Sequence, residues 1–158
     1  MLTFSGNVMV WGSMAASGVG NLTQVTGIMR KEDYIEILEN NLKESVRKVG
    51  LGKQVIFQQD NDPKHTAKVV QNWLENNNFS VMKWPAQSPD LNPIENLWSY
   101  LDSKVCRRPT KPKNSEELLE FLKQEWELIG PDFTYKLVNS MPKRIAEIIR
   151  AKGCHIPY

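Results

Sequence analysis

Cysteine is scarce in this chain, and the two that it has, Cys106 and Cys154, stand far apart in 158 residues. Such a spacing lacks the closely paired cysteines of a zinc site or a disulfide framework, so neither is expected. Long apolar runs are also missing. No stretch approaches the roughly 20 apolar residues of a membrane span, and residues 1–4 lack the basic start and apolar run of a signal peptide. The sequence therefore predicts a soluble, intracellular protein that does not act at a membrane.

A large excess of charge of one sign is absent too, because 20 Lys and Arg stand against 18 Asp and Glu, for a net charge of +2. This balance gives no argument for or against a polyanionic partner, so local clusters must decide. The 41% apolar content is enough for one ordinary hydrophobic core in a chain of 158 residues.

The first half of the chain alternates between strand-like and helix-like patterns of apolar residues. Residues 8–25 indicate a β-hairpin, and 32–49 carry apolar residues at the three- and four-residue steps of an amphipathic helix. The short apolar run 55–57 is typical of a buried strand. A second helical stripe stops at the asparagines 76–78, and another strand is expected over 79–84. Strands that alternate with helices in this order predict an α/β fold.

The segment 84–93 holds three prolines, which exclude regular structure but restrict the path of the loop. A helix is expected directly after it, because Asn92 is a good N-cap and Pro93 is favoured at the first helical position. Glu95 then lies in the first turn of that helix.

The second half contains a basic, proline-stiffened connector over 107–113, whose positive charges are Arg107, Arg108, Lys111 and Lys113. Two interpretations stay open: a strip that contacts nucleic-acid phosphates, or a solvated linker. Ser115 is expected to cap the next helix. A final helix is expected over about 143–152, with the isoleucines 145, 148 and 149 facing inward.

Two acidic residues share a position beside a structural boundary. Asp60 closes the predicted strand 55–57, and Glu95 opens the helix after the proline-rich loop, with 34 residues, 61–94, between them. One helix and one strand in that interval would bring the chain back alongside, so both carboxylates could face one pocket. Carboxylates at close range repel unless a cation lies between them, which favours a hard divalent metal.

Purely structural roles for the same residues are also open. Glu95 stands three residues after Asn92, which is the capping-box position. Asp60 could be a turn aspartate that accepts nearby backbone N–H groups, or could leave that role to Asp62, which precedes Pro63. From composition and spacing alone, these roles compete with a metal site.

Three stretches resemble a known family: QQDNDPKHTA at 58–67, WPAQSPDLNPIENLW at 84–98 and VMVWG at 8–12. Together they are similar to the catalytic domain of the mariner superfamily of cut-and-paste DNA transposases, in particular its Tc-type branch. The resemblance covers essentially the whole chain. It implies a ribonuclease H-like fold, a mixed sheet flanked by helices, and a nuclear protein that acts on transposon-end DNA and inserts at TA dinucleotides.

The resemblance also implies an active site of two aspartates and a glutamate that hold two Mg²⁺ or Mn²⁺ ions. Asp60 matches the second aspartate and Glu95 the glutamate. Their neighbours Asn61, Asp62 and His65 belong to the motif without an assigned role, and we expect them to shape the loop and the start of the following helix.

The sequence departs from the family before Val8, where the seven preceding residues include no acidic residue. The first catalytic aspartate and the central strand that bears it are therefore expected to be missing. We expect a partial ribonuclease H-like domain over 1–106, with the basic connector and C-terminal helices of 107–158 packed on it. The predicted function is that of a transposase catalytic-domain fragment, inactive alone, binding DNA without sequence preference and able to self-associate or pair with a full-length transposase. The alternative is a non-enzymatic remnant that binds DNA or protein.

Overall fold

The computed structural model describes residues 1–4, 8–52, 54–84 and 88–151, apart from the side chain of Pro89. Its strands are β1 (Leu2–Phe4), β2 (Val8–Ala15), β3 (Gly18–Val25), β4 (Val55–Phe57) and β5 (Phe79–Val81). Its α-helices are α1 (Lys31–Lys48), α2 (Lys68–Asn76), α3 (Ile94–Cys106), α4 (Ser115–Glu127), α5 (Pro131–Asn139) and α6 (Met141–Arg150). A single 3₁₀ turn, η1 (Pro89–Leu91), precedes α3.

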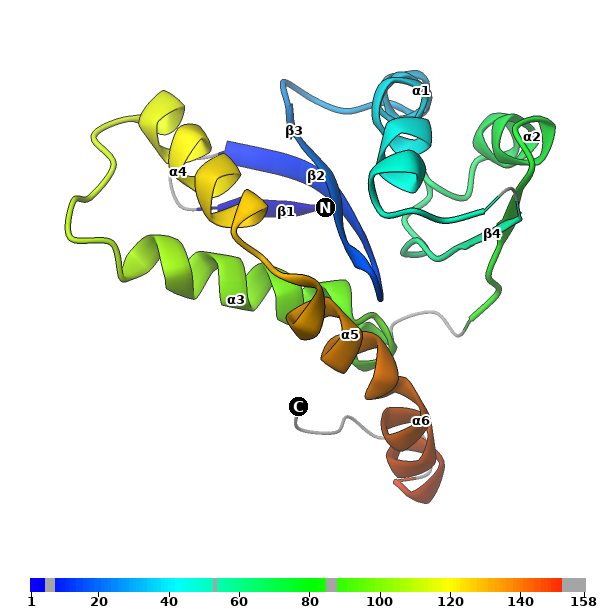
Figure 1. The fold of residues 1–158 in the computed structure, drawn as a ribbon. Helices are drawn as coiled ribbons and strands as arrows, with labels where there is room; N and C mark the ends of the chain where they lie inside the picture. Colours follow the sequence, from blue (N-terminus) through cyan, green and yellow to red (C-terminus); the bar gives the residue numbers. More distant parts are fainter. Residues whose placement is uncertain (5–7, 53, 85–87, 152–158) are drawn as a thin grey trace.

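The strands form two separate sheets (Figure 1). β1, β2 and β3 are antiparallel neighbours in that order, and β2 and β3 make the predicted hairpin. β4 and β5 pair in parallel, with Val55 opposite Phe79 and Phe57 opposite Val81. Within the described residues no ladder joins the two sheets. The predicted alternation of strands and helices is confirmed.

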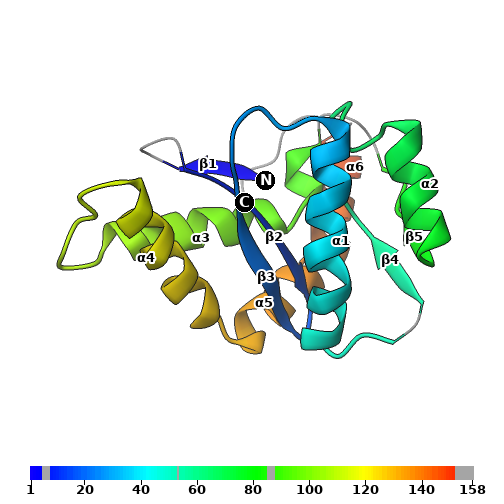
Figure 2. The ribbon, with the colours of Figure 1, turned by 90° about the horizontal axis from the view of Figure 1, so that it is seen from above.

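Successive residues of β2 enter two different cores, because neighbouring side chains of a strand point to opposite faces. Val8 and Val10 face a core built with α3 and α4, whereas Trp11 faces a core built with α1 and α2. The antiparallel sheet is therefore covered on both faces, and Figure 2 shows α1 lying between β3 and the β4–β5 pair.

The first core contains a pair of stacked indoles, Trp98 of α3 and Trp126 of α4, with ring centres 5.2 Å apart. Both are almost fully buried, and Trp126 Nε1 donates a hydrogen bond of 2.9 Å to the Gly20 carbonyl. Gly12 of β2 faces this pair, where an added Cβ would lie 2.7 Å from the tip of the Trp98 ring. The glycine therefore lets two tryptophans pack directly on the strand.

The second core forms where α1 contacts both β2 and β3 and also packs on α2. Its buried members include Tyr34 and Leu38 of α1, Val70 and Leu74 of α2, and Phe79 of β5. Through α1, the short parallel sheet is thus held against the antiparallel one.

The prediction that residues 55–57 form a strand is confirmed, but the prediction that the strand is buried is wrong. Val55 and Phe57 pack against the second core, whereas Ile56 points to the other face and is 68% exposed. The reason is that the second core lies on one face of the β4–β5 pair, whereas Ile56 lines an open cleft on the other. The strand expected over 79–84 ends at Val81.

Two predicted helix starts move. The start of α3 is Ile94, with Pro93 rather than Asn92 at the cap, and its first turn has no side-chain cap hydrogen bond. Asn114, not Ser115, caps α4, because the Asn114 side chain accepts a hydrogen bond of 2.8 Å from the Glu117 amide. The prediction that the prolines of 84–93 exclude regular structure is wrong for Pro89–Leu91, which form the 3₁₀ turn η1. Strand β1 and helix α5 were not expected from the sequence pattern.

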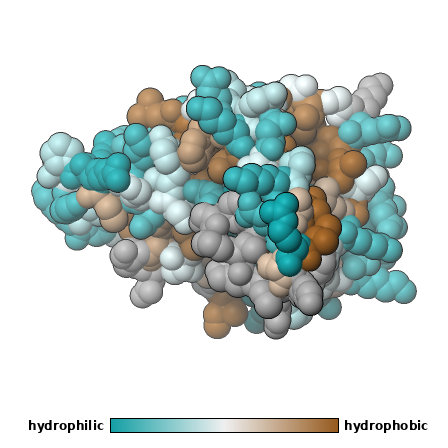
Figure 3. Space-filling model, turned by 90° about the horizontal axis from the view of Figure 1, so that it is seen from below, coloured by the Kyte–Doolittle hydropathy of each residue, from teal (hydrophilic) through white to brown (hydrophobic). Residues whose placement is uncertain are grey.

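The final helix, α6, begins two residues earlier than expected and presents a different face inward. Its buried residue is Arg144, whereas Ile145 and Ile149 are exposed. The predicted inward face is therefore wrong for Ile145 and Ile149, while Ile148 is half-buried, because α6 packs on α5 and on the η1 turn, which it meets on the side of Arg144. Seen from below, the surface mixes apolar patches with hydrophilic side chains (Figure 3). None of the helices in the described ranges is both long and apolar enough to cross a bilayer.

Candidate active site

Asp60 lies just beyond the end of β4, in a turn that its own carboxylate helps to form. Its Oδ1 atom accepts the backbone N–H of Asp62 at 3.2 Å and also contacts Nδ1 of His65. A carboxylate that accepts an N–H two residues ahead forms an Asx turn. The proposed turn role of Asp60 is thus present, but it uses only one of the two carboxylate oxygens.

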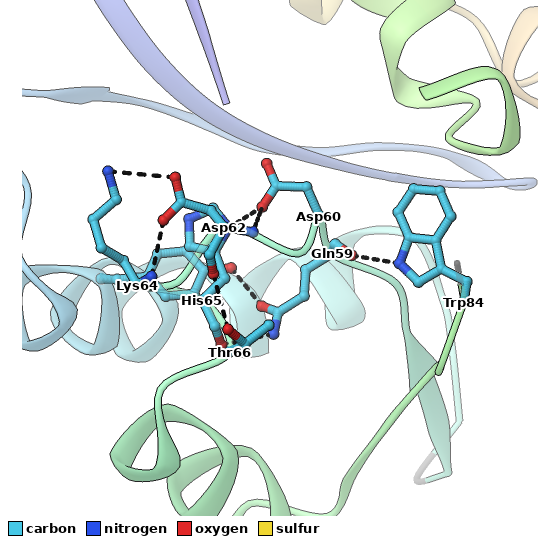
Figure 4. Close-up of polar contacts among 8 residues, drawn as sticks. Gln59, Asp60, Asp62, Lys64, His65, Thr66 and Trp84 are labelled. Carbon is cyan, nitrogen blue, oxygen red and sulfur yellow. Dashed lines mark hydrogen bonds and ion pairs between the residues drawn. The ribbon is translucent and has the colours of Figure 1, made fainter. Parts of the chain in front are cut away.

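The next residues turn the chain back beneath Asp60 (Figure 4). Asp62 accepts the Lys64 amide with its side chain at 2.8 Å, and its carbonyl accepts the amides of His65 and Thr66 at 2.9 and 3.0 Å. Pro63 stands inside this turn, where a fixed φ angle suits the bend. These contacts place the His65 ring in the interior although it belongs to a loop.

Strand β4 is also linked by hydrogen bonds to the proline-rich segment that leads to Glu95. Gln58 Nε2 donates to the Leu91 carbonyl of η1 at 2.9 Å, and Trp84 Nε1 donates to the Gln59 carbonyl at 2.8 Å. The two long motifs of the sequence, separated along the chain, are therefore in direct contact in the fold.

Glu95 is the second residue of α3, and its carboxylate does not close a capping box. The helix start has no side-chain cap hydrogen bond, although the Glu95 amide donates to the Asn92 carbonyl at 3.1 Å. The side chain instead lines a groove of about 340 Å³ between β1 and α3, together with Ser99 and Asp102.

The two carboxylates have pKa shifts of opposite sign. Burial raises the pKa of Glu95. The positive N-terminal amino group lowers this pKa, and the negative charge of Asp60 raises it further. Burial would also raise the pKa of Asp60, but hydrogen bonds from His65 and the Asp62 amide, together with positive charge on His65, lower it overall. The N-terminal amino group lowers the pKa of both carboxylates, but only Asp60 also has His65 beside it, so Asp60 is easier to ionise than Glu95.

A cleft of about 1090 Å³ opens beside Asp60 and runs along the uncovered face of β4 and β5. Its lining mixes amide and hydroxyl side chains with the apolar surface of Ile56, Met82 and Trp84. In the described part of the chain, no group of three or more Asp, Glu, His or Cys side chains is arranged to hold a metal ion. Asp60 lines this cleft whereas Glu95 lines the groove between β1 and α3, so the described residues do not place the two carboxylates in one cavity, as the sequence had suggested.

The basic connector is partly occupied by contacts within the chain. Arg108 lies 4.0 Å above the Phe121 ring, donates to Gln124 Oε1 at 2.7 Å and approaches Glu125 at 3.7 Å. Lys111 donates to the carbonyl of Cys106. Arg107, Lys111 and Lys113 are exposed.

Comparisons with known proteins agree with the motifs. The pattern of the DDE superfamily endonuclease family matches residues 4–119. The Tcb1 transposable-element transposase of Caenorhabditis briggsae is 38% identical over 153 residues, which cover 97% of this chain and 55% of the relative. The chain therefore spans about half the length of the curated relatives it matches.

Solved structures share the fold. A structure of the Mos1 transposase catalytic domain and raltegravir with Mn superposes with a TM-score of 0.85 at 22% identity, over 99% of this chain and 80% of that one. A Mos1 transposase paired-end complex with the left transposon end gives a TM-score of 0.84 at 23% identity, over 95% of this chain and 45% of that one. The predicted ribonuclease H-like architecture is confirmed. Family pattern, relatives and fold agree: the chain belongs to the DDE superfamily of endonucleases, as a homologue of Tc1/mariner transposases.

Proposed function

We propose that this chain provides part of the metal-dependent site with which a cut-and-paste transposase cleaves and joins DNA, and that Asp60 and Glu95 are its metal ligands. The observation that carries the proposal is the meeting of the two motifs. The Gln58–Leu91 hydrogen bond ties the residues after β4 to the turn before α3, and burial, with a further contribution from the charge of Asp60, raises the pKa of Glu95. Two acidic groups that repel each other in this way are a site for a cation.

The donor set suits Mg²⁺ or Mn²⁺, because both groups offer hard carboxylate oxygens. Divalent cations at such a pair supply the positive charge that activates an attacking water or DNA 3′-hydroxyl and stabilises the departing oxygen of a phosphodiester. Asp60 enters this site from the end of β4 and Glu95 from the start of α3.

DNA is the proposed partner, since a Mos1 structure contains a transposon end. Exposed Arg107, Lys111 and Lys113 are the residues that we propose contact the DNA backbone, with Arg108 contributing less because α4 already holds it. Contacts of this kind neutralise phosphates without reading bases, so binding should fall steeply as salt rises. A nuclear location and insertion at TA sites are proposed on the same family grounds.

The chain alone should cleave DNA weakly or not at all, since two carboxylates are present where the family mechanism uses three. The test incubates supercoiled plasmid with the chain and Mn²⁺, beside Asp60→Asn and Glu95→Gln, and measures Mn²⁺ binding without DNA in parallel. We expect Mn²⁺ binding that each variant weakens, and little nicking. Strong nicking that vanishes in Glu95→Gln would show that two carboxylates suffice.

A different result would contradict the metal site itself. A chain that binds no Mn²⁺ yet still binds DNA or a full-length transposase would support the alternative, a non-enzymatic binding remnant. Sedimentation of the chain alone and mixed with a full-length relative separates self-association from pairing with another transposase.

A further inference from the structure

His65 is the most enclosed polar side chain near the candidate site. It is 3% exposed, although it stands in a loop between β4 and α2. Its ring lies 4.0 Å from the Tyr34 ring, centre to centre, and Tyr34 is itself buried in the second core. A polar ring removed from water needs partners for its nitrogens, so its environment indicates its role.

The imidazole is held in one orientation by contacts from α1 and β4. Tyr34 donates its hydroxyl to Gln59 Oε1 at 2.8 Å, and Gln59 Nε2 donates to the His65 carbonyl at 3.0 Å. These bonds fix the backbone of His65, while the ring itself is held between the Tyr34 ring and the Asp60 carboxylate.

The two ring nitrogens of His65 have different surroundings. Nδ1 contacts Oδ1 of Asp60, whereas Nε2 is buried and has no hydrogen-bond partner among the described residues. A buried N–H without an acceptor is costly, while a bare ring nitrogen costs less. The favoured neutral tautomer thus carries its proton on Nδ1 and donates it to Asp60.

Both described hydrogen bonds to the Asp60 carboxylate converge on one oxygen. Oδ1 accepts from His65 and from the Asp62 amide, and no described group donates to Oδ2. The Asp60 side chain is 46% exposed, so one oxygen is anchored while the carboxylate stays open to solvent.

From this arrangement we propose that His65 is a positioning residue: its Nδ1–H fixes Oδ1 of Asp60, so that Oδ2 is the oxygen presented to a divalent cation. The proposal rests on the proposed function of Asp60 as a metal ligand. It gives His65 a role that its place in the motif leaves open. Groups that orient a ligating side chain in this way typically change metal affinity by about 10- to 100-fold when removed.

The test compares two substitutions that differ in one hydrogen bond. His65→Leu fills the space but removes the donor, whereas His65→Asn places an amide N–H at the same distance from Cβ as Nδ1. Mn²⁺ affinity is measured without DNA by electron paramagnetic resonance, at a temperature where thermal unfolding shows all three proteins folded. We expect a loss of about 10- to 100-fold in His65→Leu and recovery of most of it in His65→Asn.

Equal Mn²⁺ affinity in wild type and His65→Leu would overturn the proposal. An equal loss of affinity in both variants would also overturn it, because the loss would then not depend on the hydrogen bond that His65→Asn restores. The ¹⁵N shifts of His65 provide a readout that needs no metal. They should show the Nδ1–H tautomer, and this preference should be lost in Asp60→Ala. The chain has one other histidine, His155, and the two signals are told apart because that of His65 disappears in His65→Asn.

A dominant Nε2–H tautomer in the wild type would refute the His65 contact even if Mn²⁺ binds. If the wild type binds no Mn²⁺ but shows the Nδ1–H tautomer, the metal function fails and with it the positioning role, while the contact itself stands. The two failures are therefore distinguishable.

Discussion

The two sheets of this molecule differ in how completely they are buried. The antiparallel sheet has a core on each face, so Val8 and Val10 on one side and Trp11 on the other are nearly free of solvent contact. The parallel β4–β5 pair is covered on one face only and leaves Ile56 and Met82 exposed on the other. Because hydrophobic stabilisation scales with the apolar area removed from water, most of the folding energy should reside around the antiparallel sheet.

The candidate site draws one carboxylate from each region. Glu95 stands at the start of α3, whose Leu97, Trp98 and Leu101 are fully buried in the first core. Asp60 follows the half-covered strand β4 and depends on local turn bonds and on His65 for its orientation. The comparison indicates that Glu95 is fixed by the core, whereas Asp60 is fixed by a small polar network that can be altered without unfolding the protein.

The largest effect is expected from a cavity in the first core. Leu101→Ala should lower the free energy of unfolding by about 2–5 kcal/mol, because the lost side chain is fully buried and leaves a void. The matched change Ile56→Ala, on the open face of β4, should cost far less, since that side chain is already 68% exposed. Urea denaturation of both variants measures the difference, and similar losses would show that the two sheets are buried alike in solution.

A smaller loss is expected where α6 meets the turn before α3. Arg144 is 3% exposed; its Nη1 donates to the Asp90 carbonyl at 3.1 Å, and its Nε donates to Ser140 Oγ at 2.7 Å. Arg144→Met keeps the length but removes these bonds and should cost about 1.5–3 kcal/mol, the range for hydrogen bonds to a charged group. The exposed Arg150 of the same helix provides the control Arg150→Met.

Hydrogen exchange adds a local readout to that experiment. If Arg144 holds η1 in place, the amide of Leu91, which bonds to the Ser88 carbonyl at 3.0 Å, should exchange faster in Arg144→Met than in Arg150→Met. Equal exchange in the two variants would contradict a link between α6 and the turn that leads to Glu95.

Next comes the close approach of Gly12 to the indole pair. Gly12→Ala would place a Cβ 2.7 Å from Trp98 and 3.0 Å from Trp126, so both rings must move, at a cost of about 1–3 kcal/mol. Gly52→Ala is the control, because nothing lies within 4 Å of its added Cβ. Thermal unfolding followed by tryptophan fluorescence reports both stability and the stacking, and an unchanged midpoint in Gly12→Ala would mean that the rings have room.

The sequence predicted the parts of this fold that are local or periodic. The hairpin, the stripe of α1 and the helix that starts near Glu95 all follow from spacing and turn residues. The three-residue strand β1 has too short a pattern to stand out, because it is defined by pairing with β2. Helix α5 was missed for a similar reason: it is nine residues long, and Ser140 alone separates it from α6.

Side-chain burial was harder to predict than secondary structure. Apolar periodicity assigned the isoleucines of α6 to the interior, but burial depends on which neighbour covers a face, and η1 contacts Arg144 instead. The enclosure of His65 likewise depends on a residue far away in the sequence. The Tyr34 ring packs against the imidazole, and the Tyr34 hydroxyl donates to Gln59, which lies 25 residues further along the chain. Motif membership could single out His65, but only the tertiary contacts indicate what it touches.

The smallest expected effect, and the one most specific to the site, is a pH-dependent difference between the two carboxylates. The pKa of Glu95 is raised in the folded chain, so the folded state favours the protonated side chain. The stability that this contributes is present below the ordinary glutamate pKa and is lost as pH rises through the folded pKa. At pH 7 the ionised side chain therefore costs stability, and Glu95→Gln should raise the melting temperature. As pH falls toward about 4, the ordinary range of a glutamate, the gain should shrink.

Asp60 should behave in the opposite way in the same assay. Its pKa is lowered, so the folded state favours the ionised side chain. The stability that this contributes is present above the ordinary aspartate pKa and is lost as pH falls through the folded pKa. Asp60→Asn should therefore lower the melting temperature at pH 7. Mn²⁺ then sharpens the contrast, since a ligand that binds only the folded state raises its stability. Added Mn²⁺ should stabilise the wild type more than either variant and reverse the order of wild type and Glu95→Gln. An unchanged order at saturating Mn²⁺ would mean that Glu95 does not bind the metal. A Glu95→Gln melting temperature below wild type at pH 7 without metal would mean that burial and the charge of Asp60 do not raise the pKa of Glu95 in solution.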